Sequence, residues 1–139
     1  MTHPTILNAV NAFTESWTET ETRMKEAFLN LKDYLETKEG VTLDFNSRPG
    51  VSYSLRACHA AQTERDLFVM MDVIDDDPAE RWLSVCFYGD MITDPEEEGD
   101  LIPEGLKGSD GYCFDMDDYD EEKVAYLKAR FDEACTNAS

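Results

Sequence analysis

Four acidic side chains between residues 94 and 100 have the chemistry to bind a divalent cation. They are Asp94, Glu96, Glu98 and Asp100. Calcium takes carboxylate and carbonyl oxygens as ligands, and acids at every second position supply that donor type. The spacing is not that of an EF-hand, because Glu96 and Glu98 fill its third and fifth places and Gly105 its twelfth. We therefore expect at most weak divalent-cation binding here, and the sequence indicates no cofactor.

Two further acidic clusters are candidates for contact with a partner protein. They comprise Asp75, Asp76 and Asp77, and then Asp115, Asp117 and Asp118. Each cluster has a local explanation, because acids keep a hairpin tip soluble and acids before a helix cap it and complement its dipole. No local rule requires three acidic clusters in one half of a chain. We therefore expect these acids to lie on a surface that binds a basic partner.

Cysteine and histidine do not form a known catalytic or metal-binding pattern in this sequence. The cysteines are Cys58, Cys86, Cys113 and Cys135, and no CxxC pair occurs. Cys58 and His59 are sequence neighbours, so on a strand they would point to opposite faces, whereas a thiol nucleophile needs a histidine beside it in space. Structural zinc usually takes closely spaced ligand pairs. We expect four buried, reduced thiols.

The motifs of the common enzyme classes are missing. The sequence has no GxGxxG, GxxxxGK[ST], HExxH or GxSxG. Its carboxylates are abundant but lie in polar runs, whereas an acid–base site needs acids in an apolar pocket. Asp72 is the exception, because it lies within an apolar run and must face solvent or pair with Arg56 or Arg81. The sequence therefore favours a non-enzymatic protein.

The negative charge of the chain is concentrated in its second half. The net charge is −19, of which residues 71–139 carry −16. A field of this sign repels phosphate backbones and anionic membranes and attracts basic proteins. The chain has neither an apolar run near the ~20 residues of a membrane span nor a secretory signal at its start. We expect a cytoplasmic monomer or homodimer whose partner is a basic protein, with no nucleic acid and no membrane as partner.

Apolar residues recur at helical spacing at both ends of the chain. The segment 4–38 has an apolar stripe at steps of three and four, which predicts a long helical segment. The polar stretch 18–23 interrupts this stripe and starts with a Thr-x-x-Glu capping pattern, so two helices are the alternative to one. A final helix is expected over 119–135, capped by Asp118 or Asp120.

Between these helices the apolar period is two, which predicts strands. The expected strands lie at 41–46, 51–57, 67–74, 81–89 and 112–116. The first two form a hairpin whose turn contains Pro49 and Gly50, the residue types that suit a type II turn. Pro and Gly break up residues 90–111, so we expect a long acidic loop without regular structure there.

These elements predict one α+β domain over residues 1–139, with an antiparallel sheet of four to five hairpin-connected strands between residues 41 and 116. The long N-terminal helix and the C-terminal helix are expected on one face of the sheet. Strand–helix–strand alternation is missing, which excludes a Rossmann-type parallel sheet. As function we expect binding of a basic protein through the acidic C-terminal half, as a chaperone, inhibitor or adaptor. The alternatives are a ligand-binding or enzymatic domain with a pocket under the 90–111 loop, or a weak divalent-cation binder.

Overall fold

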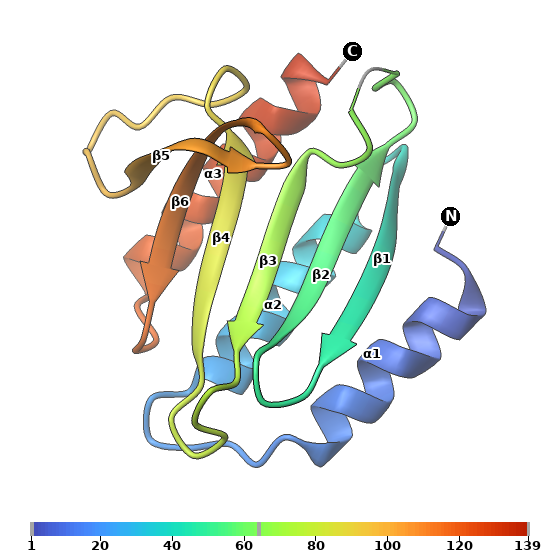
Figure 1. The fold of residues 1–139 in the computed structure, drawn as a ribbon, viewed down its shortest axis with the longest axis vertical. Helices are drawn as coiled ribbons and strands as arrows, with labels where there is room; N and C mark the ends of the chain where they lie inside the picture. The colour runs from blue at the N-terminus through green and yellow to red at the C-terminus, as the bar shows by residue number, and fades with distance from the viewer. Residues whose placement is uncertain (1, 64, 139) are drawn as a thin grey trace.

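The computed structural model describes residues 2–63 and 65–138. In these residues two helices precede six strands, and a third helix follows the strands (Figure 1). The helices are α1 (Pro4–Ser16), α2 (Met24–Glu36) and α3 (Glu121–Asn137). The strands are β1 (Val41–Arg48), β2 (Ser52–His59), β3 (Val69–Ile74), β4 (Trp82–Tyr88), β5 (Asp100–Leu106) and β6 (Ser109–Met116). They form one antiparallel sheet in the order β1-β2-β3-β4-β6-β5. The expected α+β class with an antiparallel sheet is confirmed, with six strands instead of four or five.

The N-terminal helical segment is two helices, separated at the polar stretch that interrupts the apolar stripe. Arg23 adopts a left-handed conformation with φ 59° immediately before α2. The carboxylate of Glu19 accepts hydrogen bonds from the backbone N–H groups of Lys25 (3.2 Å) and Glu26 (2.9 Å). Glu19 therefore satisfies two free donors at the start of α2. The prediction of a single helix over 4–38 is therefore wrong. The second helix begins at Met24, which is further along the chain than the capping pattern suggested.

The turn between β1 and β2 has the expected type II geometry. The N–H of Val51 donates to the carbonyl of Arg48 at 2.9 Å, and Gly50 has φ +83°. A residue with a side chain is strained at this φ, so the Pro-Gly pair explains where the hairpin turns. The second expected hairpin, β3–β4, is also present.

Strand β5 lies where the sequence predicted an irregular loop, so that expectation is wrong for residues 100–106. β5 is an edge strand, and its pairing with β6 is irregular between Ile102 and Leu106. An edge strand tolerates a proline such as Pro103 because one side of its backbone has no ladder partner. Gly105, whose added Cβ would lie 2.3 Å from Ile102 Cγ2, allows the strand to bend closely over itself.

The helices cover one face of the sheet and leave the other uncovered. Figure 1 shows α2 and α3 on the same side of the strands. The face they cover is fully buried in the middle of the sheet, where Val73, Val85 and Phe87 are 0% exposed. Phe87 contacts Phe131 of α3 with ring centroids 5.7 Å apart. The alternate residues of the same strands form the opposite side, which we call the open face; it is defined by Ser54, Arg56, Cys58, Met70, Asp72, Ile74, Trp82, Ser84, Cys86, Cys113 and Asp115.

Helix α1 lies beside β1 and packs through aromatic rings. The ring of Phe13 stacks on Tyr53 of β2 with centroids 4.0 Å apart, and it meets Phe28 of α2 edge to face. The last helix starts as predicted, with the Asp120 carboxylate accepting hydrogen bonds from the N–H groups of Glu122 and Lys123. No helix in residues 2–63 and 65–138 is long and apolar enough to cross a membrane.

Candidate functional site

Three connections that are far apart in the sequence meet at one end of the sheet. They are the α1–α2 link, the β3–β4 turn and the β6–α3 link (Figure 1). The N–H of Tyr119 donates to the carbonyl of Thr22 at 2.9 Å, which holds the first and last of these connections together. Between the connections lies a cleft of about 500 Å³, whose lining includes Glu21, Glu80 and Asp117.

Trp82 is the aromatic residue of this end. It is the first residue of β4, lies on the open face and is partly exposed. It lines the cleft and also a second cavity of about 370 Å³ with Asp115 and Asp117. The other tryptophan, Trp17, is only 3% exposed and belongs to the core. We name this feature the acidic end and define it by Glu21, Glu80, Trp82, Asp115 and Asp117.

The acids of this end carry uncompensated charge. All four carboxylates are exposed. Within residues 2–63 and 65–138 none of them takes part in an ion pair. The nearby cation Arg81 is directed to Asp75 instead, at 2.7 Å between Nε and Oδ1. A charged group on an incoming molecule would therefore meet a negative surface beside an aromatic ring.

The six acids predicted to contact a partner have different positions in the structure. Asp115 and Asp117 meet at Trp82, and Asp76, Asp77 and Asp118 are exposed on nearby connections. Asp75 is buried at 2% exposure and bonded to Arg81, so its assignment to an exposed contact surface is wrong.

Sequence reasoning missed Glu21, Glu80 and Trp82 at this end. Trp82 had a detectable signal, because it alternates with the apolar residues of β4 that face the helices. Glu21 and Glu80 had none, since only the tertiary fold brings their connections together.

The predicted cation loop is built around hydrogen bonds from Asp94. Its two carboxylate oxygens accept from the N–H groups of Glu98 (3.0 Å) and Gly99 (2.9 Å), and one also accepts from the hydroxyl of Tyr126 on α3. Partial burial raises the pKa of Asp94, but these hydrogen bonds outweigh it and lower the pKa below its ordinary value. Asp94 therefore holds the loop closed and attaches it to α3.

The other three acids of the predicted cation site do not converge with Asp94. Glu96, Glu98 and Asp100 have exposed side chains. Among the described residues, no three His, Cys, Asp or Glu side chains are grouped so that they could hold a metal ion. Weak divalent-cation binding stays a prediction from the spacing alone.

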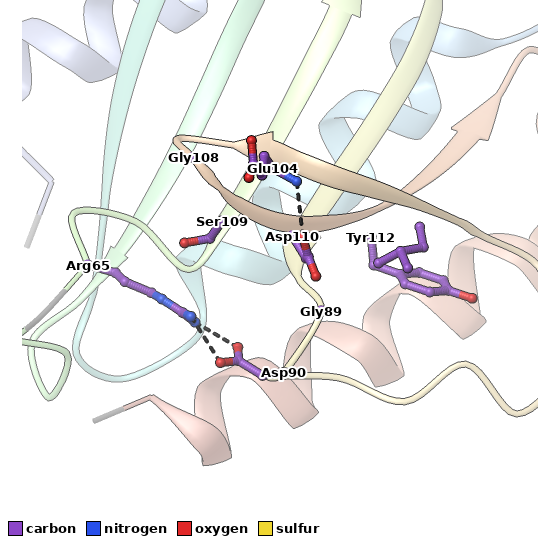
Figure 2. A pocket seen from close by; sticks show the side chains of 9 residues that line it. Arg65, Gly89, Asp90, Glu104, Gly108, Ser109, Asp110 and Tyr112 are labelled. Carbon is purple, nitrogen blue, oxygen red and sulfur yellow. Dashed lines mark hydrogen bonds and ion pairs between the residues drawn. The ribbon is translucent and has the colours of Figure 1, made fainter.

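A polar cavity of about 660 Å³ lies at the opposite end of β4, beside the β5–β6 hairpin (Figure 2). The guanidinium of Arg65 binds the carboxylate of Asp90 through two hydrogen bonds of 2.7 and 2.9 Å and stacks 3.9 Å from the centre of the Tyr88 ring. This hydrogen-bonded ion pair lowers the pKa of Asp90. Across the cavity, the carboxylate of Asp110 accepts from the N–H of Glu104 at 3.0 Å. The charged groups seen here hold the cavity walls together.

Asp72 lies in the middle of the open face, so it faces away from the core. Its register neighbours are Ser54 on β2 and Ser84 on β4. One carboxylate oxygen, Oδ1, is buried and has no hydrogen-bond partner within the described part of the chain. Burial raises the pKa of Asp72, against the opposing effects of a hydrogen bond with Ser54 and the charge of Arg56.

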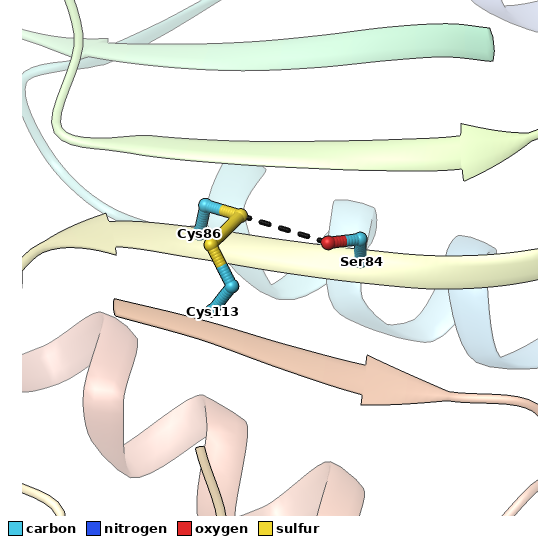
Figure 3. Close-up of a disulfide and its surroundings, with 3 residues drawn as sticks. All are labelled: Ser84, Cys86 and Cys113. Carbon is cyan, nitrogen blue, oxygen red and sulfur yellow. Dashed lines mark hydrogen bonds between the residues drawn. A yellow bond between two sulfur atoms is a disulfide. The ribbon is translucent and has the colours of Figure 1, made fainter. Parts of the chain in front are cut away.

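The cysteines differ from the four buried, reduced thiols that were expected. Cys86 is buried, whereas Cys58, Cys113 and Cys135 are partly exposed. Cys86 and Cys113 form a disulfide between β4 and β6 (Figure 3). The expectation failed because neither the missing secretory signal nor the missing CxxC pair reports strand register, and the register of β4 and β6 places the two cysteines directly opposite each other. Cys58 and Cys135 are free, and burial raises the pKa of both thiols.

The fold and its acidic end define the protein as a small α+β protein with a six-stranded antiparallel sheet, helices on one face and a concentration of acids at one end. Comparison of the chain with protein-family models, with curated proteins and with solved structures gives no match.

Proposed function

We propose that this protein binds a basic partner protein at the acidic end and does not catalyse a reaction. The observation that carries the proposal is the meeting of acids from three separate connections around the partly exposed Trp82. The cleft is lined by three acids and by Arg81, whose charge is paired with Asp75. A lining of net negative charge raises the local concentration of cationic groups. The net charge of −19 steers a basic protein toward the chain at long range.

The combination of Trp82 with carboxylates is suited to arginine or lysine side chains. A guanidinium or ammonium over the face of an indole ring gains about 0.5–2 kcal/mol, depending on how much water is excluded. Tryptophan is also among the residues that dominate binding energy at protein interfaces. Trp82 therefore supplies apolar contact, while Glu21, Glu80, Asp115 and Asp117 provide the charge that selects a basic side chain.

The first test uses an arginine-rich peptide carrying fluorescein, titrated at low and high ionic strength. The triple variant Glu21→Gln, Glu80→Gln, Asp117→Asn removes three charges of the acidic end. At roughly 0.5 kcal/mol for each exposed charge contact, we expect about a tenfold loss of affinity. The matched control Glu96→Gln, Glu97→Gln, Glu98→Gln removes three exposed charges from the other acidic loop and should change affinity less than about twofold.

If both triple variants weakened peptide binding equally, the peptide would be attracted by the overall charge of the chain. That result would contradict a binding site at the acidic end. Absence of binding even at low ionic strength would contradict the proposal altogether. The intrinsic fluorescence of Trp82 gives an independent signal, since Trp17 is in the core. Peptide binding should change the emission of the natural protein and leave that of Trp82→Phe unchanged.

The natural partner can then be sought with the same three proteins as bait. Mass spectrometry of captured proteins should find a basic protein that the natural chain and the control variant retain at low salt. The acidic-end variant should not retain this protein even at low salt, and high salt should release it from the natural chain and the control variant. A protein retained equally by all three baits is not the proposed partner.

A second candidate function is small-ligand binding in the cavity beside Arg65, Asp90 and Tyr112. The observation that favours it is the volume of about 660 Å³, which lies within the usual range for ligand pockets. A thermal-shift screen of polar metabolites tests it. A hit counts only if Asp110→Asn abolishes the shift and the control Asp44→Asn, on the distant strand β1, preserves it.

A further inference from the structure

The disulfide between Cys86 and Cys113 joins strands that are already paired. Their Cα atoms are 4.1 Å apart, close to the spacing of the narrow, non-hydrogen-bonded pairs of an antiparallel ladder. The β4–β6 register continues on both sides of the bond, from Leu83 opposite Met116 to Tyr88 opposite Gly111. The backbone ladder therefore maintains this pairing on its own, so the strands can stay together when the disulfide opens.

The two cysteine residues differ in their solvent exposure. Both cysteines lie on the open face, away from α2 and α3, because they alternate with the buried Val85, Phe87 and Phe114. Cys86 is 7% exposed, whereas Cys113 is partly exposed. Cys113 is therefore the more exposed residue of the pair and the better candidate for attack by a thiolate from solvent.

Cys86 has a hydrogen-bonding group beside it that can stabilise a departing thiolate. The hydroxyl oxygen of Ser84 lies 3.6 Å from the sulfur of Cys86, within hydrogen-bond distance for sulfur (Figure 3). When the disulfide opens, the hydroxyl of Ser84 can donate its proton in a hydrogen bond to the thiolate of Cys86. Exchange becomes faster as the departing thiolate is stabilised.

We propose that Cys86–Cys113 is a reversible disulfide that undergoes thiol–disulfide exchange, with Cys113 as the attacked sulfur and Cys86 as the leaving thiolate. An external thiolate forms a bond to the Cys113 sulfur, the Cys86–Cys113 bond breaks, and Cys86 takes up a proton. A second external thiolate then attacks the mixed disulfide at the external sulfur and releases Cys113. In total two external thiols are oxidised to a disulfide, and the protein disulfide is reduced to two thiols.

Charge around Cys113 selects the thiol that reacts. Asp100 lies directly opposite Cys113 on β5, and Asp115 follows two positions later on the same face of β6. Both carboxylates are exposed. They repel anionic thiols and attract cationic ones, and salt weakens both effects. The proposal is therefore specific for neutral or basic thiols, and it holds whether or not the acidic end binds a partner.

The main test compares three small thiols on the Cys58→Ser, Cys135→Ser variant, which keeps only the disulfide pair. Cysteamine is cationic, 2-mercaptoethanol neutral and 3-mercaptopropionate anionic. Reduction is followed by alkylation of the released thiols and mass spectrometry. Each rate is divided by the rate of the same thiol with a small uncharged disulfide, because the nucleophilicity of a thiolate falls with its pKa. We expect cysteamine to react at least about tenfold faster than 3-mercaptopropionate at low salt, with the ratio falling toward one at high salt.

Asp100→Asn with Asp115→Asn should reduce the cysteamine preference severalfold, and the control Glu96→Gln with Glu98→Gln should not. Equal rates for the three thiols at low salt would overturn the charge selection. Reduction no faster than global unfolding, measured by hydrogen exchange on the same protein, would overturn exchange in the native state.

Single cysteine variants test which sulfur is attacked. After Cys86→Ser in the same background, cystamine should form a mixed disulfide with Cys113. After Cys113→Ser, the remaining Cys86 should react at least about tenfold more slowly, because it is buried. Faster reaction at Cys86 would overturn the assignment. If circular dichroism shows that either variant is unfolded, the test is reoxidation of the reduced two-cysteine protein with cystamine. Recovery of the Cys86–Cys113 bond in the folded protein would support a reversible disulfide. Failure to recover the bond would overturn the proposal.

Discussion

Arg81 Nε lies 2.7 Å from Asp75 Oδ1, and this ion pair connects three parts of the fold. The second oxygen of Asp75 accepts a hydrogen bond from the N–H of Gly50 at 2.9 Å, in the turn between β1 and β2. The guanidinium carbon of Arg81 lies 5.3 Å from the centre of the Phe13 ring on α1. The pair therefore ties the β3–β4 turn to the first hairpin and to the first helix.

Removing one member of this pair should strongly destabilise the protein. Asp75→Ala leaves the largely buried Arg81 without its counter-ion, and loss of one partner of a buried pair typically costs about 3–5 kcal/mol. Urea unfolding of the natural protein and the variant measures the difference. Asp76→Ala is the matched control, since Asp76 is exposed, and it should change stability by less than about 0.5 kcal/mol. Similar effects of the two substitutions would refute the structural role of the pair.

Glu19 should stabilise the start of α2 from outside the helix. Glu19→Ala removes the acceptor of the Lys25 and Glu26 N–H groups, and loss of a capping acceptor costs about 0.5–2 kcal/mol. Hydrogen exchange at these two amides should become faster, while exchange in the middle of α3 should change only as much as global stability does. Glu15→Ala, in α1, is the control. Unchanged exchange at Lys25 and Glu26 would contradict the capping role.

Much of the fold was predictable because it depends on local patterns. The type II turn at Gly50 and the cap Asp120 each follow from a few neighbouring residues, whereas the polar stretch 18–23 left open whether one helix or two precede the sheet. Strand β5 could not be predicted in this way, because Pro103 and Gly105 are residue types typical of loops. Such residues are tolerated in a strand only at the edge of a sheet. The placement of β6 between β4 and β5 is a property of the whole sheet, and no local pattern indicates it.

The site was less predictable than the fold for the same reason. The acids were identified by type, but burial separates Asp75 from its neighbours Asp76 and Asp77. Asp94 looked like a metal ligand because its carboxylate lies in an acidic run, yet its oxygens bind N–H groups of its own loop. Composition indicates charge, whereas the hydrogen bonds of each carboxylate decide its role.

Reduction of the disulfide should lower stability without changing the fold. Cys86 and Cys113 are 27 positions apart. Closing a loop of that length destabilises the unfolded chain by roughly 3.5 kcal/mol. Urea unfolding of the Cys58→Ser, Cys135→Ser variant, oxidised and reduced, measures the difference. The reduced form should have a lower midpoint and a steeper dependence on urea, because its unfolded chain exposes more surface. Identical midpoints would show that the bond is not formed in the purified protein.

Asp94 should make the attachment of its loop to α3 sensitive to acid. The hydrogen bonds that Asp94 accepts from Tyr126, Gly99 and Glu98 lower its pKa below the ordinary value of 3.8. The carboxylate of Asp94 therefore binds a proton less readily in the folded state than in the unfolded state. The stabilisation is therefore fully present above pH 3.8 and is lost as the pH falls through the lower pKa of the folded protein.

Asp94→Asn should cost about 1 kcal/mol at neutral pH, the usual value of an accessible hydrogen bond. The difference in unfolding free energy between the natural protein and this variant should stay constant from neutral pH to about pH 5 and shrink below pH 3.8. Urea unfolding at a series of pH values measures it, with Glu97→Gln as the exposed control. Tyr126→Phe should reproduce part of the loss, because it removes the donor on α3. A difference that grows toward acid pH would mean that the carboxylate of Asp94 destabilises the fold, contrary to the hydrogen bonds it accepts.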